Sequence, residues 1–306
     1  MMINKRLIQA VPESKKYIAL NVALQWLSLA ANIVMIGAIG FFLQKLLTKT
    51  EDVTSIIVLA SIAVGAIIVR FLCTIGAARM SHLSSESVKK TLRNKIYSKL
   101  LRLGSSYNSK VSTSEVVQMS VEGVDQLDIY FASYLPQFFY SMIAPIPLFV
   151  VLFFINWQSA LILLGCVPLI PISIALVQTF AKKLLSKYWG QYTALGDTFL
   201  ENLQGLTTLK IYQADAKKNE EMNVEAEHFR KITMKVLTMQ LNSISIMDIV
   251  AFGGAAAGIV MAVSQLAAGN IDFAGCIIII LLSADFFIPM RQFGSFFHIA
   301  MYGGQR

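Results

Sequence analysis

Six long apolar stretches organise the chain, separated by short polar links and two long charged blocks. About 20 consecutive apolar residues in a helix cross the ~30 Å hydrocarbon core of a bilayer. The charged blocks, residues 79–132 and 182–242, are compatible with helix and contain no proline. The six apolar stretches are residues 17–44, 53–78, 133–155, 159–181, 243–267 and 271–290. This pattern predicts an all-α membrane protein whose spans continue into the aqueous compartment.

The composition supports a membrane protein and excludes a soluble domain. Hydrophobic residues make up 56% of the chain, charged residues only 14%, and the mean hydropathy is +0.62. All but three of the 26 Lys and Arg residues lie at or beyond the predicted inner ends of the spans; the exceptions are Lys45, Lys49 and Arg70. By the positive-inside rule, both termini face the cytoplasm. This distribution by topology argues against nucleic-acid binding as the reason for the net charge of +8.

The chain divides into an entry segment, one membrane domain and a tail. Residues 1–16 form a cytosolic entry segment, because the apolar run from Tyr17 is too long for a signal peptide. Residues 17–303 form one six-helix domain, and residues 304–306 form the tail. The two charged blocks of the six-helix domain are expected to fold as cytosolic helical hairpins, with breaks at Leu103–Asn108 and Tyr212–Asn219. A continuous helix over residues 159–212 would be ~80 Å long.

Four charged residues within or at the ends of the spans are candidates for function. An ionised side chain at mid-bilayer costs at least ~2.5 to 3.5 kcal/mol on insertion scales, so it usually has a purpose. The four are Arg70, Asp248, Asp285 and Arg291. Two interpretations stay open: the side chains line a hydrated pathway for a polar substrate, or they pair between helices and only hold the bundle together.

A haem or metal site is a second, smaller possibility. His82 follows Arg79 by three residues, so both fall on one helical face. The ring nitrogen offers an iron ligand, and the guanidinium offers a partner for a propionate. The alternative is an ordinary surface pair between His82 and Glu86, one turn further along the helix.

Gly254 and Gly258 have the four-residue spacing of small residues that allows two helices to pack closely in a membrane.

Three runs of residues carry a resemblance to a known family. Residues Glu201–Tyr212 read ENLQGLTTLKIY, which resembles the E-x-x-x-G-x-x-x-(aliphatic)-(K/R)-x-(aromatic) run before the second coupling helix of type I ABC exporters. The other runs are Glu122–Leu127 with Tyr130, Phe131 and Tyr134–Gln137, and Phe286–Gly294 with His298. Together they resemble the CydD half of CydDC-type exporters over essentially the whole chain.

The resemblance implies a six-helix type I exporter domain whose cytosolic hairpin tips dock on nucleotide-binding domains. The implied docking residues are Lys110, Ser112, Thr113, Ser114, Glu115, Ile211, Tyr212, Gln213, Asp215 and Lys217. It also implies a second six-helix half, either CydC-like or an identical copy, and membrane lipids as surroundings. The implied cargo is a small thiol such as cysteine or glutathione, or a haem-related compound.

The sequence departs from a complete exporter in one respect. It contains no G-x-x-x-x-G-K-[ST] loop to cradle phosphates, so we expect no ATP or Mg²⁺ site and no ATPase activity in this chain. The nucleotide-binding domain is then either truncated away or supplied by a separate chain. Two rivals stay open: a stand-alone proton-coupled transporter or channel that uses Asp248 or Asp285 as carrier, and an inactive truncated subunit.

Overall fold

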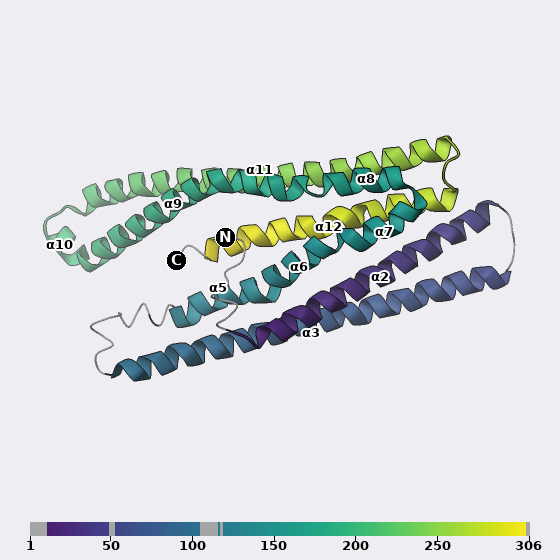
Figure 1. The fold of residues 1–306 in the computed structure, drawn as a ribbon. Helices are drawn as coiled ribbons and strands as arrows, with labels where there is room; N and C mark the ends of the chain where they lie inside the picture. Colours follow the sequence, from purple (N-terminus) through teal and green to yellow (C-terminus); the bar gives the residue numbers. More distant parts are fainter. Residues whose placement is uncertain (1–10, 49–52, 105–115, 117–118, 304–306) are drawn as a thin grey trace. The chain divides into compact units, whose positions relative to one another are not determined.

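The computed structural model describes residues 11–48, 53–104, 116 and 119–303, and all regular secondary structure within them is helical (Figure 1). The chain separates into two compact units. One, here called the bundle, consists of Met1–Pro168 and Val250–Arg306; the other, here called the hairpin, consists of Leu169–Ile249. Six helical segments within the described residues are long and apolar enough to cross a membrane. The predicted all-α fold with six spans is therefore confirmed.

The bundle begins with two long helices joined as an antiparallel pair, α2 (Ser14–Leu47) and α3 (Val53–Leu103). Further along, two π-helical turns, η2 (Met119–Gly123) and η3 (Tyr130–Tyr134), flank the short helix α5 (Val124–Ile129). This segment packs against the charged half of α3. It leads the chain from the charged part of the bundle into its third span.

Prolines and one asparagine set the boundaries of the next three helices. Pro136 and Pro145 stand in the first turns of α6 (Leu135–Ile143) and α7 (Pro145–Ile155), and the missing amide hydrogen of each interrupts the helical hydrogen bonds there. The side chain of Asn156 then accepts a hydrogen bond from the Ser159 amide and caps α8 (Trp157–Cys166). These local signals divide the third and fourth spans into shorter helices.

Two glycines in the last third of α11 let neighbouring helices of the bundle pack closely. A Cβ atom on Gly254 would lie 2.6 Å from the Phe287 ring, and one on Gly258 would lie 2.5 Å from Leu163. Both glycines belong to α11 (Asp215–Ala267), while Phe287 belongs to α12 (Phe273–Gly303). The close contact predicted from the glycine spacing is therefore present, with α8 and α12 as the neighbours.

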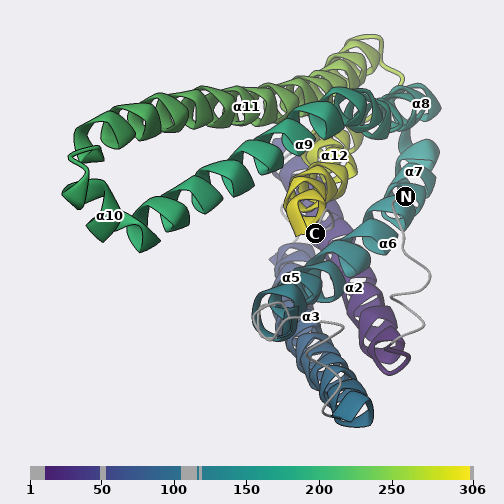
Figure 2. The ribbon, with the colours of Figure 1, turned by 90° about the vertical axis from the view of Figure 1, so that its left-hand side faces the viewer.

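The hairpin consists of α9 (Leu169–Gln204), α10 (Leu206–Ile211) and the first part of α11, to Ile249. Figure 2 shows α10 at the far end of the hairpin, between the long helices α9 and α11. Tyr188 and Tyr192 on α9 pack against Phe229 on α11, with ring centroids 5.4 and 5.9 Å apart. This aromatic contact fixes the register of the two long helices.

Both predicted breaks in the charged blocks are found. Helix α3 ends at Leu103, and Gly104 follows it with a φ of 58°. Helix α10 ends at Ile211, and Gln213 follows with a φ of 53°. Residues 159–212 nevertheless do not form one helix, because the chain is also interrupted at residues 167–168 and at Gly205.

Candidate functional site

A polar relay connects three helices within the bundle. The Nδ2 group of Asn32 on α2 donates a hydrogen bond to Oδ2 of Asp285 on α12, at 2.5 Å. The Oδ1 atom of the same amide accepts a hydrogen bond from the Arg70 guanidinium on α3, at 2.8 Å. Asn32 itself is 7% exposed. One neutral amide thus bridges two opposite charges that lie in different predicted spans.

Asn32 was not among the residues predicted from the sequence. Its side chain carries no charge, so it does not stand out within an apolar stretch as Arg70 and Asp285 do. Of the two interpretations left open, interhelical pairing is therefore present in an indirect form. The Arg70 side chain keeps further N–H donors, so the relay retains groups for a polar substrate.

A proline lies one helical turn after the relay. Pro289 has no amide hydrogen, so the carbonyl of Asp285 lacks its usual partner in α12. The Pro289 carbonyl instead accepts a hydrogen bond from Gln137 at 2.9 Å, and the Tyr134 ring packs at a tilt against the Phe293 ring, with centroids 5.5 Å apart. Two of the runs that carry the family resemblance, one on α6 and one on α12, are therefore in direct contact.

The other two predicted membrane charges have different surroundings. The Arg291 guanidinium lies 5.6 Å from the centre of the Phe252 ring, which is cation–π geometry. Asp248 is half-buried in the part of α11 that belongs to the hairpin. Arg70 and Asp285 thus lie in one hydrogen-bonded cluster, joined through Asn32.

Backbone hydrogen bonds around Gln213 close the turn between α10 and α11. The amide of Ala214 donates to the Leu209 carbonyl at 2.9 Å, and the amide of Gln213 donates to the Lys210 carbonyl at 3.2 Å. This pattern ends a helix through one left-handed residue. The Lys210 ammonium lies 3.8 Å from the Asp215 carboxylate and bridges α10 to α11.

The same tip exposes two large apolar side chains. Ile211 is 72% exposed and Tyr212 is 78% exposed, while Gln213 and Lys217 are exposed as well. The predicted docking residues of this tip therefore form one accessible surface, here called the hairpin tip (Ile211–Lys217). The other predicted docking residues, Lys110, Ser112, Thr113, Ser114 and Glu115, lie outside the described residues.

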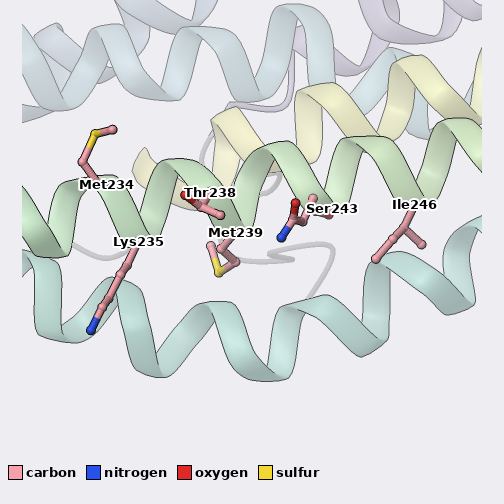
Figure 3. A pocket seen from close by; sticks show the side chains of 7 residues that line it. Met234, Lys235, Thr238, Met239, Ser243 and Ile246 are labelled. Atoms are coloured by element: carbon pink, nitrogen blue, oxygen red, sulfur yellow. The ribbon is translucent and has the colours of Figure 1, made fainter.

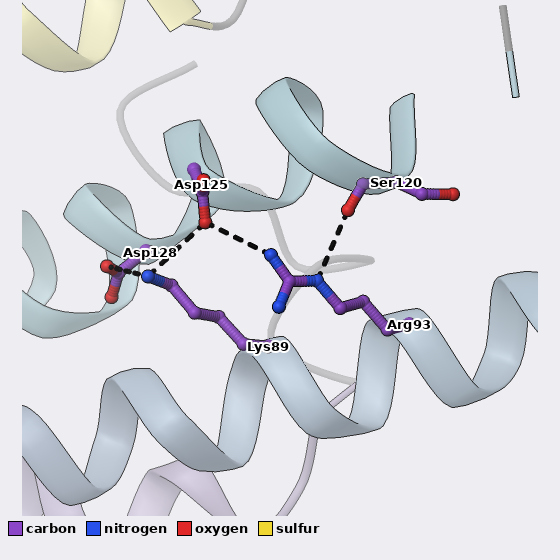
Figure 4. Close-up of polar contacts among 5 residues, drawn as sticks. All are labelled: Lys89, Arg93, Ser120, Asp125 and Asp128. Atoms are coloured by element: carbon purple, nitrogen blue, oxygen red, sulfur yellow. Dashed lines mark hydrogen bonds and ion pairs between the residues drawn. The ribbon is translucent and has the colours of Figure 1, made fainter. Parts of the chain in front are cut away.

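An ion-pair cluster ties the charged half of α3 to α5 (Figure 4). Lys89 lies 3.0 Å from the Asp128 carboxylate and 3.3 Å from that of Asp125, and Arg93 also contacts Asp125 at 3.4 Å. The guanidinium of Arg93 donates to the Ser120 carbonyl at 3.2 Å. The hydrogen bond to Asp128 raises the pKa of Lys89 above its usual value. Asp125 belongs to another run that carries the family resemblance.

A shallow groove of about 500 Å³ runs along α11 within the hairpin. Figure 3 shows Met234 and Lys235 leaving the helix on different sides, with Met239 further along the groove. The lining combines flexible apolar chains with hydroxyl, amide and ammonium groups. Its members are Met234, Lys235, Thr238, Met239, Asn242, Ser243 and Ile246.

The residues predicted for haem, Arg79 and His82, are both exposed on α3. They offer one ring nitrogen and one guanidinium on the same helical face. Within the described residues, no group of three or more His, Cys, Asp or Glu side chains is arranged to hold a metal ion.

Comparison with known proteins assigns the fold to a family. The model of the ABC transporter transmembrane region matches residues 17–290. The chain belongs to this family. It is 49% identical over 278 residues to an uncharacterised ABC transporter ATP-binding protein of Haemophilus influenzae, covering 91% of this chain and 50% of that protein.

More distant relatives have named transport functions. The chain is 28% identical to the CydD protein of a glutathione/L-cysteine transport system in Escherichia coli, over 72% of this chain and 39% of that protein. It is 25% identical to the corresponding CydC protein of Bacillus subtilis, over 83% and 45%. The chain spans about half the length or less of these relatives. The family and the exporter-type membrane domain are therefore shown, while CydD-like specificity rests on low identity.

Proposed function

We propose that this chain is the permease half of an ATP-driven exporter in a bacterial cytoplasmic membrane, with both termini in the cytoplasm. The family match and the six spans support this proposal. ATP and Mg²⁺ then bind on nucleotide-binding domains that belong either to a longer form of the chain or to a partner. The names of the relatives, which join ATP-binding and permease functions, are consistent with that division.

The hairpin tip is the observation that carries the coupling role. An aqueous surface that places Ile211 and Tyr212 side by side, more than two thirds exposed, is unfavourable unless another surface covers them. Interfaces are anchored by such residues, with charged residues at the rim. Lys210, Asp215 and Lys217 supply that rim here. We propose that a nucleotide-binding domain receives the tip, and that residues 110–115 act in the same way.

A second six-helix half completes the pathway in this proposal, as a CydC-like partner or an identical copy. The relay of Arg70, Asn32 and Asp285 supplies both charge signs within the spans, which suits a small polar cargo. A thiol such as cysteine or glutathione is the cargo that the named relatives support. A haem-related cargo would use Arg79 and His82, with the opposite wall of its site supplied by another chain.

A photo-crosslinker at Tyr212 tests the coupling role. We expect crosslinking in native membranes to give an adduct that yields peptides of a nucleotide-binding domain after digestion. The matched control is a crosslinker at Val224, which is 66% exposed on α11 but lies outside the tip. Equal labelling from both positions, or adducts containing only lipid, would contradict the proposed coupling.

A further inference from the structure

A cavity of about 460 Å³ lies in the bundle where α2, α7 and α12 meet. Both α2 and α7 pack on α12, and the cavity lies between them. Phe41 and Phe154 line it while being 55% and 84% exposed, so it opens at the surface of the bundle. Its volume falls within the ~300–1,000 Å³ range of small-molecule sites.

Close packing beside the cavity shows that the space is not a generally loose region. A Cβ atom on Gly40 would lie 2.7 Å from Ile278, and one on Gly275 would lie 2.9 Å from Ile155. A Cβ atom on Gly37, one turn before Gly40, would meet nothing within 4 Å, because Gly37 faces the cavity. Helix α12 is thus closely packed against α2 and against α7, while the cavity between these helices remains open.

The cavity is apolar along most of its length and polar at one end. The apolar part includes Ile33, Val151 and Ile278, all within the predicted spans. The polar end consists of Gln44, Asn270 and Asp272, beside the turn between α11 and α12. Within the described part of the chain, Asp272 forms no salt bridge, and its side chain is exposed.

We propose that this cavity binds one acyl chain of a phospholipid whose amine headgroup pairs with Asp272. An apolar space at this depth does not hold water well, because water there finds too few polar partners. An empty space would instead forfeit the dispersion contacts of its walls. A lipid chain entering between Phe41 and Phe154 restores those contacts, and the carboxylate at the polar end favours a headgroup that carries an ammonium group over one whose only charge is the phosphate. The inference rests on the membrane fold and is independent of the cargo.

Native mass spectrometry of the full chain, purified with any subunits that accompany it, tests the proposal. The probes are palmitoyl-oleoyl phosphatidylethanolamine and palmitoyl-oleoyl phosphatidylglycerol, which share their acyl chains and differ in the headgroup. Gly37→Leu fills the cavity and is expected to weaken retention of both lipids by about tenfold. Gly65→Leu is the matched control, since Gly65 also lies in a span with nothing within 4 Å of its Cβ position, but it does not line the cavity.

Asp272→Asn separates the headgroup contact from the chain contact. We expect this variant to keep the acyl chain and to lose a two- to fivefold preference for the ethanolamine lipid, the size of effect typical of an exposed ion pair. Equal retention by the Gly37→Leu and Gly65→Leu variants would overturn the proposal. No retained lipid in the wild type, as when a second copy of the chain seals the cavity, would overturn it too.

Discussion

The bundle and the hairpin use polar side chains in opposite ways. In the bundle, Asn32 is buried and joins charges from two other helices, so each partner depends on the fold being intact. In the hairpin, ion pairs such as Arg230–Glu227 at 2.7 Å are exposed and link neighbouring turns of one helix. Such local pairs contribute little to stability. The difference indicates that the polar contacts of the bundle specify its packing, whereas the hairpin's surface is available to a partner.

The two turns at the ends of α11 show the same contrast in the backbone. At one end Asn270 donates to the Gln265 carbonyl at 2.9 Å, and the left-handed residue is Gly269, with φ of 74°. At the hairpin tip the same pattern closes around Gln213. Glycine adopts this conformation without strain, whereas other residues pay about 1–2 kcal/mol. Gln213 therefore occupies a left-handed position at the hairpin tip that glycine would occupy without strain.

The largest expected effect comes from the hairpin tip. We predict that Ile211→Asp combined with Tyr212→Asp lowers ATP-driven transport by at least about tenfold, because anchor residues dominate interface energies. The free energy of unfolding should change by no more than about 0.5 kcal/mol, since both side chains are exposed. Val224→Asp serves as the control on the same hairpin. Unchanged transport in the double variant would show that the exposed hairpin tip does not serve as a docking surface for a partner.

Substitutions in the relay of Arg70, Asn32 and Asp285 should change the free energy of unfolding, whereas those at the hairpin tip should change transport and leave stability unchanged. We expect Asn32→Leu to destabilise the protein by about 1–3 kcal/mol, because it leaves the groups on Arg70 and Asp285 without their shared partner. Unfolding in mixed micelles measures this. In a double-mutant cycle with Asp285→Leu, the two effects should fail to add by at least about 0.5 kcal/mol. Simple additivity would show that the relay is not a unit.

Much of the fold followed from the sequence, because hydropathy and helix breakers act locally. Apolar length gave the six spans, and the clusters after Leu103 and Ile211 ended helices where expected. The break at Gly205 was missed because a lone glycine inside a helical pattern is usually tolerated. Asn32 was missed because its role depends on which helices pack together, and one apolar run carries no information about its neighbours.

Exchanging the two turn residues gives a smaller effect of opposite sign at each site. Gln213→Gly should stabilise the protein by about 0.5–1 kcal/mol by relieving the left-handed strain. Gly269→Gln should destabilise it by about 1–2 kcal/mol for the same reason. Thermal unfolding of both variants measures these changes. A loss of stability in Gln213→Gly would show that the glutamine side chain itself holds the tip.

The smallest effect is the pH dependence of the exposed ion pairs. The hydrogen bond from Arg230 lowers the pKa of Glu227 below its usual value of 4.5, and Lys218 lowers that of Glu221 similarly. Their contribution is complete above pH 4.5 and is lost as the pH falls through the lowered pKa. The raised pKa of Lys89 acts at the other extreme, since its contribution is complete below pH 10.5 and is lost at higher pH. Melting temperatures of the wild type and Glu227→Gln should therefore differ slightly at pH 7 and converge in acid; a constant difference would contradict the assignment.

Coupling of ATP hydrolysis to transport through the hairpin tip is tested most directly in inside-out vesicles that contain the chain with its partners. The measurement is uptake of labelled cysteine or glutathione, with either ATP or a pH gradient as the only energy source. We predict uptake with ATP alone, loss of uptake in the Ile211→Asp, Tyr212→Asp variant, and continued ATP dependence in Asp248→Asn and Asp285→Asn. An amide does not take up and release a proton near neutral pH. Uptake driven by the gradient alone and abolished by one Asn substitution would contradict ATP-driven export and establish a proton-coupled carrier.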